Sequence, residues 1–185
     1  AYDEDTTKAT VIVPMKLHNE KRRLELDVNK VDKDHHDHFL NGAIFEVYDK
    51  TAKSYVTTLA SGQLMIVSND VNEEYEISKN EDFTKVIKTV KTDENKQIIL
   101  DMDDGTYYSR KVGDDKVSKH VIKDGKAVLA DAIYGHEYEF KEIKAPTSYQ
   151  LADKSKAYKV EADKDTDTII YYFENARIVV PNTGV

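Results

Sequence analysis

Three histidines and three aspartates lie within one short stretch of this chain, where they could serve as metal ligands: His35, His36, His38, Asp32, Asp34 and Asp37. Imidazole and carboxylate groups of this kind bind zinc or nickel. The stretch is polar throughout, which is more typical of a solvated loop between two strands, and we expect no metal and no cofactor. A metal-dependent enzyme built on these histidines is the least favoured function. The sequence shows neither a glycine-rich phosphate loop nor a Ser-His-Asp pattern.

Composition excludes several other classes of function. The chain has 185 residues, 34% of them charged, with a net charge of -8. A diffuse acidic balance argues against binding to nucleic acid or to anionic membranes. No apolar run approaches the roughly 18 residues that a membrane span needs. The absence of cysteine removes disulfides, thiolate metal sites and cysteine nucleophiles together.

Period-two alternation of apolar and polar residues is the main structural signal. It occurs at 24–29, 43–48, 138–143 and 168–173, with turn pairs at Asn41-Gly42, Asp104-Gly105, Asp124-Gly125 and Tyr134-Gly135. Twelve tyrosines accompany the alternation, and aromatic residues favour half-buried strands. Many short strands with frequent turns predict an all-β sandwich.

One segment has a different period. Phe83, Val86, Ile87 and Val90 follow helical spacing, and the Ser78-x-x-Glu81 pattern before them is typical of a capping box. We predict a short helix near 79–90, with an edge strand as the alternative.

The C-terminal residues Val180, Pro181, Asn182, Thr183 and Gly184 resemble the LPXTG sorting signal of Gram-positive surface proteins, with Val in place of Leu. The resemblance implies that a sortase cleaves after Thr183 and joins its carbonyl to an amine. An ordinary terminal tail is the alternative. The hydrophobic segment and basic tail that follow such signals are not in this sequence, so we expect a trimmed ectodomain or a processed product.

Four further patterns occur in order: 26–32, 40–49, the box Tyr138–Tyr149 and 172–176. Together they resemble the Cna B-type (SpaA-like) domain of Gram-positive pilins and adhesins, which has a Lys-x-Asp start, a Leu-x-Gly-Ala-x-Phe strand, an Ala-Pro box containing Glu and a last strand containing Asn. The resemblance implies a Greek-key, immunoglobulin-like sandwich over 21–178. Typical members are shorter, so we expect an inserted subdomain at about 55–120.

The same resemblance implies an intramolecular isopeptide bond between Lys30 and Asn175, with Glu142 as its catalyst. Burial favours a neutral, nucleophilic amine and a protonated carboxyl group. We expect Glu142 to donate a hydrogen bond to the Asn175 amide oxygen and to pass a proton to departing ammonia. Lys33 is a neighbouring candidate in a more polar stretch. Ordinary surface or turn positions are the alternative for each residue taken alone.

Two expectations concern the N-terminal region. Residues 1–20 echo the end of the chain, so we expect either the closing strand of a preceding domain or a simple extension. Lys16, in Val13-Pro14-Met15-Lys16, loosely resembles the lysine of the pilin motif that accepts the next subunit. No Tyr precedes the Pro and Met15 intervenes, so an exposed lysine is the alternative.

The sequence therefore predicts a structural subunit or stalk domain of a sortase-assembled pilus or cell-wall-anchored protein on a Gram-positive surface. Its expected partners are sortase and other pilin subunits or peptidoglycan, with no small-molecule substrate. Formation of the isopeptide bond would be a single self-modification rather than enzymatic turnover. The alternative function is an adhesin module whose inserted region binds a host extracellular ligand.

Overall fold

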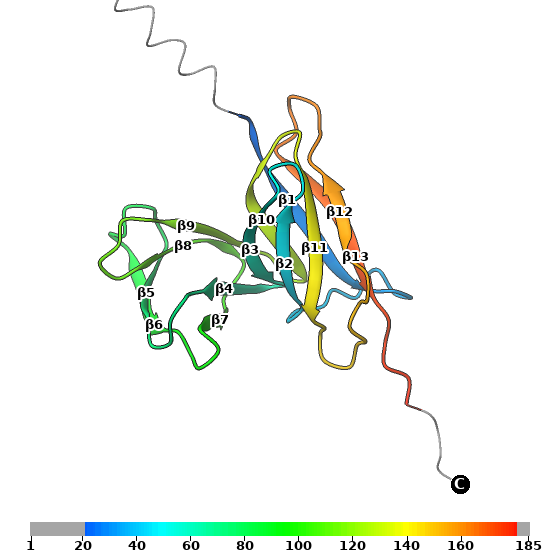
Figure 1. Ribbon diagram of the computed structural model, residues 1–185, viewed down its shortest axis with the longest axis horizontal. Coiled ribbons are helices and arrows are strands. Elements are labelled where there is room, and N and C mark those ends of the chain that lie inside the picture. Colours follow the sequence, from blue (N-terminus) through cyan, green and yellow to red (C-terminus); the bar gives the residue numbers. More distant parts are fainter. Residues whose placement is uncertain (1–20, 181–185) are drawn as a thin grey trace, which may run out of the picture.

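The computed structural model describes residues 21–180, which form three antiparallel or mixed β-sheets and contain no α-helix (Figure 1). Sheet A has the strand order β10 (Lys126–Ile133), β1 (Arg23–Asp32), β13 (Thr168–Asn175). Sheet B has the order β12 (Lys156–Lys159), β11 (Glu137–Lys144), β2 (Ile44–Asp49), β3 (Ser54–Ala60), β4 (Gln63–Val67), β7 (Gln97–Asp101). Sheet C has the order β6 (Val86–Lys91), β5 (Glu74–Ser78), β8 (Gly105–Lys111), β9 (Ser118–Ile122).

Sheets A and B pack face to face around the main hydrophobic core. Alternate residues of a strand point to the same face, and β1 contributes Leu26 and Val28 to this core. Phe45 of β2 meets Phe173 of β13 edge to face, with ring centroids 4.9 Å apart, and it meets Phe140 of β11 at 5.7 Å. The prediction of an all-β sandwich is confirmed.

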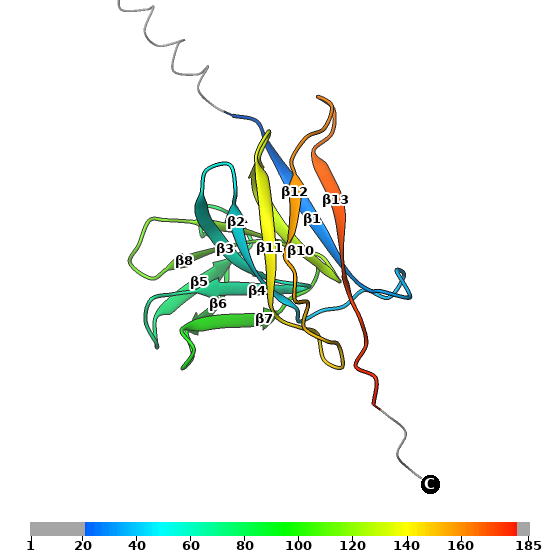
Figure 2. The ribbon, with the colours of Figure 1, turned by 45° about the vertical axis from the view of Figure 1, so that its right-hand side comes forward.

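The first and last described strands lie side by side and run parallel. Their register extends from Glu25 opposite Thr168 to Asp32 opposite Asn175. Because the two strands point the same way, the chain enters the sandwich at one end and leaves it at the other, as Figures 1 and 2 show. Any covalent link between β1 and β13 would therefore connect the first and the last strand of the domain directly.

Residues 61–125, between β3 and β10, build a second unit beside the sandwich (Figure 1). Strands β4 and β7 extend sheet B, and sheet C packs with them around a separate hydrophobic cluster: Leu64, Ile66, Ile77, Ile98, Tyr107 and Ile122. This segment therefore has a hydrophobic core of its own, separate from the core between sheets A and B.

The helix predicted near 79–90 is wrong, and the alternative of an edge strand is confirmed. Residues 79–85 form turns, in which Phe83 adopts a positive φ of 58° that ends any helical path. The Ser78 hydroxyl contacts the Asn80 side chain instead of capping a helix. Strand β6 then pairs with β5 at the edge of sheet C. Its β-branched Val86 and Ile87 suit a strand at least as well as a helix.

The described residues contain no helix long and apolar enough to span a membrane. Lys16, the predicted extension at 1–20 and the signal residues Pro181–Gly184 lie outside the described residues.

Gly125, in the turn between β9 and β10, holds β1 in place next to Lys30. Its carbonyl accepts the Lys30 amide at 2.8 Å, and its own amide donates to Asn41 Oδ1 at 2.7 Å. Gly125 has a φ of +68°, and a Cβ atom added there would lie 2.1 Å from the Cβ of Phe39. Both the left-handed backbone and the close approach of Phe39 therefore require glycine.

We predict that Gly125→Ala lowers the free energy of unfolding by about 3 kcal/mol, through strain and the clash with Phe39. Gly113→Ala is the matched control, since Gly113 has a φ of +87° and open space around it; it should cost about 1 kcal/mol. Urea unfolding of both variants measures the difference. Equal losses would contradict the close contact at Gly125.

Candidate functional site

Lys30 is a lysine buried in the core of a sandwich. It lies on the same face of β1 as Leu26 and Val28, and it is fully buried, with an exposed fraction of 0%. Its Nζ donates to the carbonyl oxygen of Phe173 at 2.9 Å and lies 5.4 Å from the centre of the Phe173 ring. Among the described residues it forms no ion pair within 4 Å.

Burial lowers the pKa of Lys30 to about 8, although the charges of Glu142, Glu174 and Asp32 act in the opposite direction. At neutral pH the neutral form of the Lys30 amine is therefore favoured relative to that of an exposed lysine.

Asn175 reaches the same place from the end of β13. It lies two residues beyond Phe173, the register partner of Lys30, so the two side chains share one face of sheet A. Its Nδ2 donates to the carbonyl oxygen of Gln150 at 2.7 Å and to Glu142 Oε1 at 2.7 Å. A backbone carbonyl only accepts hydrogen bonds, so Gln150 fixes which side of the amide faces it.

Glu142 comes from the opposite sheet, on the inward face of β11 with Tyr138 and Phe140. Its Oε1 accepts the backbone amide of Ala152 at 2.9 Å as well as Asn175 Nδ2. The hydrogen bond that we expected with the Asn175 amide oxygen is therefore made to the amide nitrogen. Glu142 lies beside the atom that would leave as ammonia.

Two buried acceptor atoms of this cluster have no hydrogen-bond partner, Glu142 Oε2 and Asn175 Oδ1. An unpaired buried polar atom costs about 1–3 kcal/mol, so two in one cluster call for an explanation. The structure brings together Lys30, Glu142 and Asn175 in a region closed to solvent, since all three are at most 3% exposed.

The other candidate residues are not part of this cluster. Lys33 is exposed, as are His35, His36 and His38. His36 lies against Tyr172 and Glu174, and residues 21–180 contain no group of three or more side chains able to hold a metal ion.

Sequence reasoning missed a second set of polar contacts, which lies next to Lys30 in the sequence. Buried Asp32, two residues after Lys30, accepts the Tyr149 hydroxyl at 2.6 Å and Arg177 Nε at 3.2 Å. The hydrogen bond from Tyr149 is the largest cause that holds the pKa of Asp32 down, at about 2. The sequence did contain one half of this contact, since Tyr149 is the final Tyr of the Ala-Pro box. Local spacing gave no indication that its partner is Asp32.

Comparison with known proteins places this architecture in a family. The family model described as SpaA, a prealbumin-like fold domain, matches residues 25–177. No curated protein matches the chain.

Solved structures with similarity to the chain include three pilins. A minor pilin of Streptococcus agalactiae has 22% identity and a TM-score of 0.42, covering 89% of this chain and 49% of that one. The shaft pilin of Lactobacillus rhamnosus GG has 14% identity and a TM-score of 0.42, with coverage of 88% and 48%. The major pilin of Corynebacterium diphtheriae has 17% identity and a TM-score of 0.37, with coverage of 86% and 32%.

This chain spans about half the length of those proteins, or less. The assignment itself rests on the family model, which covers the whole sandwich from β1 to the residues just after β13. The chain belongs to the SpaA family of prealbumin-like fold domains.

Proposed function

We propose that this protein is a structural subunit or stalk domain of a sortase-assembled pilus or cell-wall-anchored protein, locked by an isopeptide bond between Lys30 and Asn175. The observation that carries the proposal is the convergence of a buried amine, a buried carboxyl group and a buried amide from the first strand, the facing sheet and the last strand. The carboxamide has its nitrogen on Glu142 and its oxygen unpaired.

The bond forms as follows in this proposal. Neutral Lys30 Nζ attacks Cγ of Asn175, and the new Nζ–Cγ bond forms as the Cγ–Nδ2 bond breaks. Glu142 takes the proton that Lys30 loses and delivers it to Nδ2, which departs as ammonia. Exclusion of water and fixed geometry make an otherwise slow amide exchange feasible. The reaction occurs once in each molecule, so the protein is not a turnover enzyme.

The stabilisation expected from such a bond is large. The closed loop spans 145 residues (175 minus 30). In the chain-entropy treatment used for disulfides, a loop of this length stabilises the fold by about 5 kcal/mol. An amide is not reducible, which suits a cysteine-free domain on a cell surface.

We predict that the intact mass of the purified chain is one ammonia below the mass of its sequence. Glu142→Ala and Lys30→Met should have the full mass, because they lack the catalyst and the nucleophile. Glu139→Ala, on the same strand but the other face, is the matched control and should lose ammonia as the parent does. Fragmentation should locate the bond at Lys30 and Asn175. A parent chain at full mass would falsify the bond.

The assembly role depends on the signal at 180–184. Incubation with a pilus sortase should join the chain covalently through Thr183 to an amine, either of another subunit or of peptidoglycan. Thr183→Ala should abolish the product, since the sortase is expected to recognise the signal with Thr at the cleavage position. Val185→Ala, outside the signal, should leave the product unchanged. A product that survives Thr183→Ala would contradict the role of this signal.

A second candidate function is a host-binding adhesin module, favoured by strand β6. This strand forms one edge of sheet C, and its Val86 and Ile87 are 40% and 46% exposed. An open, partly apolar edge can accept an extended segment of a protein partner. Ile87→Lys should then reduce binding of the chain to immobilised extracellular-matrix proteins without changing its thermal stability. Equal binding by parent and variant would exclude this edge.

A further inference from the structure

The loop between β11 and β12 supplies two backbone groups that hold the candidate cluster. The carbonyl oxygen of Gln150 accepts Asn175 Nδ2 at 2.7 Å, and the amide of Ala152 donates to Glu142 Oε1 at 2.9 Å. The loop therefore determines which side of the carboxamide faces Glu142 and where the carboxyl group itself points. A shift of this loop would displace both groups together.

The loop has few anchors of its own. It consists of residues 145–155, and within that range only Pro146 and Tyr149 are buried. Ser148, next to Tyr149, has a φ of +73°, a left-handed conformation that is unfavourable for a residue with a side chain. Such backbone persists where surrounding contacts hold it. Contacts with other elements must therefore fix the course of the loop.

Tyr149 is the side chain that ties the loop to the sandwich. It is 8% exposed, and its hydroxyl donates to Oδ2 of Asp32 at 2.6 Å. Asp32 ends β1, two residues after Lys30, and it is the register partner of Asn175 in β13. The hydroxyl therefore attaches the loop to the strand of the buried amine, at the point where that strand lies next to the carboxamide.

Asp32 is held firmly as the acceptor. It is 1% exposed, and its Oδ1 accepts the backbone amides of Asp34 at 2.8 Å and His35 at 3.2 Å. This leaves Oδ2 for Tyr149 and for Arg177 Nε. The hydrogen bond from Tyr149 and the other contacts lower the pKa of Asp32 to about 2, against the effect of burial. A hydrogen bond to an ionised acceptor is stronger than one between neutral groups.

The backbone of the loop pairs with the segment that follows β13. The Gln150 amide donates to the Ala176 carbonyl at 2.8 Å, and the Ser148 carbonyl accepts the Ile178 amide at 3.0 Å. Among the described residues, the hydroxyl of Tyr149 makes the one hydrogen bond that links this loop to β1. Without it, the position of the loop relative to the strand of the buried amine would depend on packing alone.

We propose that Tyr149 is a positioning residue for the isopeptide bond, and that its hydrogen bond to Asp32 holds the loop in the place that the reaction requires. The inference rests on the proposed function, in which Lys30 attacks Cγ of Asn175. Tyr149 exchanges no proton with the reacting atoms and acts through the two backbone groups that hold Glu142 and the carboxamide. Because a misplacement of about 1 Å can slow a reaction about a hundredfold, one such hydrogen bond can control the rate.

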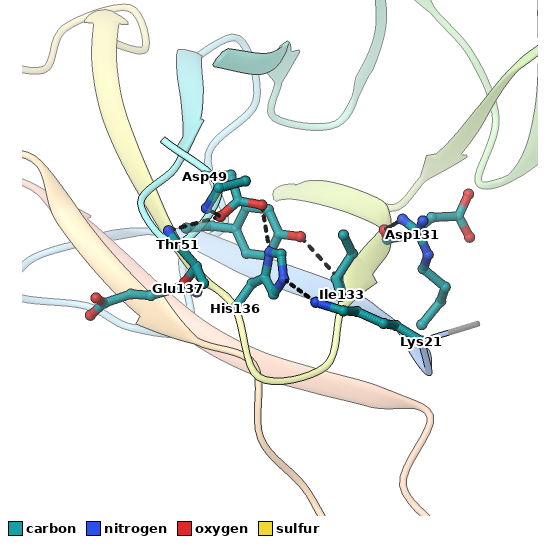
Figure 3. A network of polar contacts seen from close by, with 10 residues as sticks. Lys21, Asp49, Thr51, Asp131, Ile133, His136 and Glu137 are labelled. Carbon is teal, nitrogen blue, oxygen red and sulfur yellow. Dashed lines mark hydrogen bonds and ion pairs between the residues drawn. The ribbon is translucent and has the colours of Figure 1, made fainter. Parts of the chain in front are cut away.

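A control of the same chemical kind lies at the other end of β11. Tyr138 is 2% exposed, and its hydroxyl accepts the Ile133 amide at 2.9 Å. Ile133 is part of the polar network in Figure 3, in which His136 Nδ1 lies 2.7 Å from Asp49 Oδ2 and His136 Nε2 lies 3.3 Å from Lys21 Nζ. Tyr138→Phe thus removes one buried hydrogen bond without touching the cluster.

The first test follows the bond as it forms. The full 185-residue chain is made by cell-free synthesis at neutral pH, samples are denatured at intervals, and the intact mass gives the fraction that has lost ammonia. Tyr149→Phe should react at least about tenfold more slowly than the parent chain, and Tyr138→Phe should react at the parent's rate.

Three results of this test would overturn the inference. If Tyr149→Phe reacts as fast as the parent, the inference fails and the proposed function stands. If Tyr149→Phe and Tyr138→Phe are slowed equally, the effect is one of stability and the positioning role fails. If the parent chain never loses ammonia, the proposed function fails and the inference fails with it.

The second test measures the position of the loop and does not need the bond. In Lys30→Met, which cannot react, hydrogen exchange followed by NMR measures the protection of the Ala152 amide. Adding Tyr149→Phe should lower this protection at least about tenfold more than that of the β2 amides in the same sandwich, because the loop then opens locally. An equal loss at Ala152 and in β2, or no loss at Ala152, overturns the positioning role.

Discussion

The burial of the Lys30 amine between two sheets is the constraint on which the rest of this structure depends. Removing an ammonium from water costs several kcal/mol unless it is paired, and here the nearest partner is the backbone carbonyl of Phe173. The aromatic core around Phe45 and Phe173 excludes water, and this burial lowers the pKa of Lys30 and favours the neutral form of its amine. Glu142 and Asn175 are also buried and are joined by a hydrogen bond, and each of them has one oxygen atom without a hydrogen-bond partner.

The parallel pairing of β1 and β13 determines how a force on the two ends of the domain would act on the strands that hold the buried cluster. Force applied to the two ends of the domain acts along these adjacent strands, and their hydrogen bonds would carry it in shear. A covalent bond between them would transfer the load past the remaining strands. Sheet C lies to one side of these two strands (Figure 1).

Local patterns predicted well wherever a strand buries one face against an apolar core. The alternation around Leu26, Phe45 and Phe140 predicted strands correctly, because a strand that packs one face against the core of a sandwich places every second residue in that core. The pattern around Phe83 and Val90 failed for the opposite reason. Its spacing fits both periods, and pairing with β5 decided the outcome. The Gln150 carbonyl that orients Asn175 has no sequence signature, because every residue carries a carbonyl group.

The sequence by itself predicted the class of fold from its alternating strands, and its resemblance to the Cna B-type domain pointed to Lys30, Glu142 and Asn175 as candidate residues. Only the tertiary structure decided that Glu142 contacts the amide nitrogen and that His136 stands between Asp49 and Lys21. These contacts join residues from separate strands and turns. Their geometry depends on how two sheets stack and how turns close, and neither is encoded in local spacing.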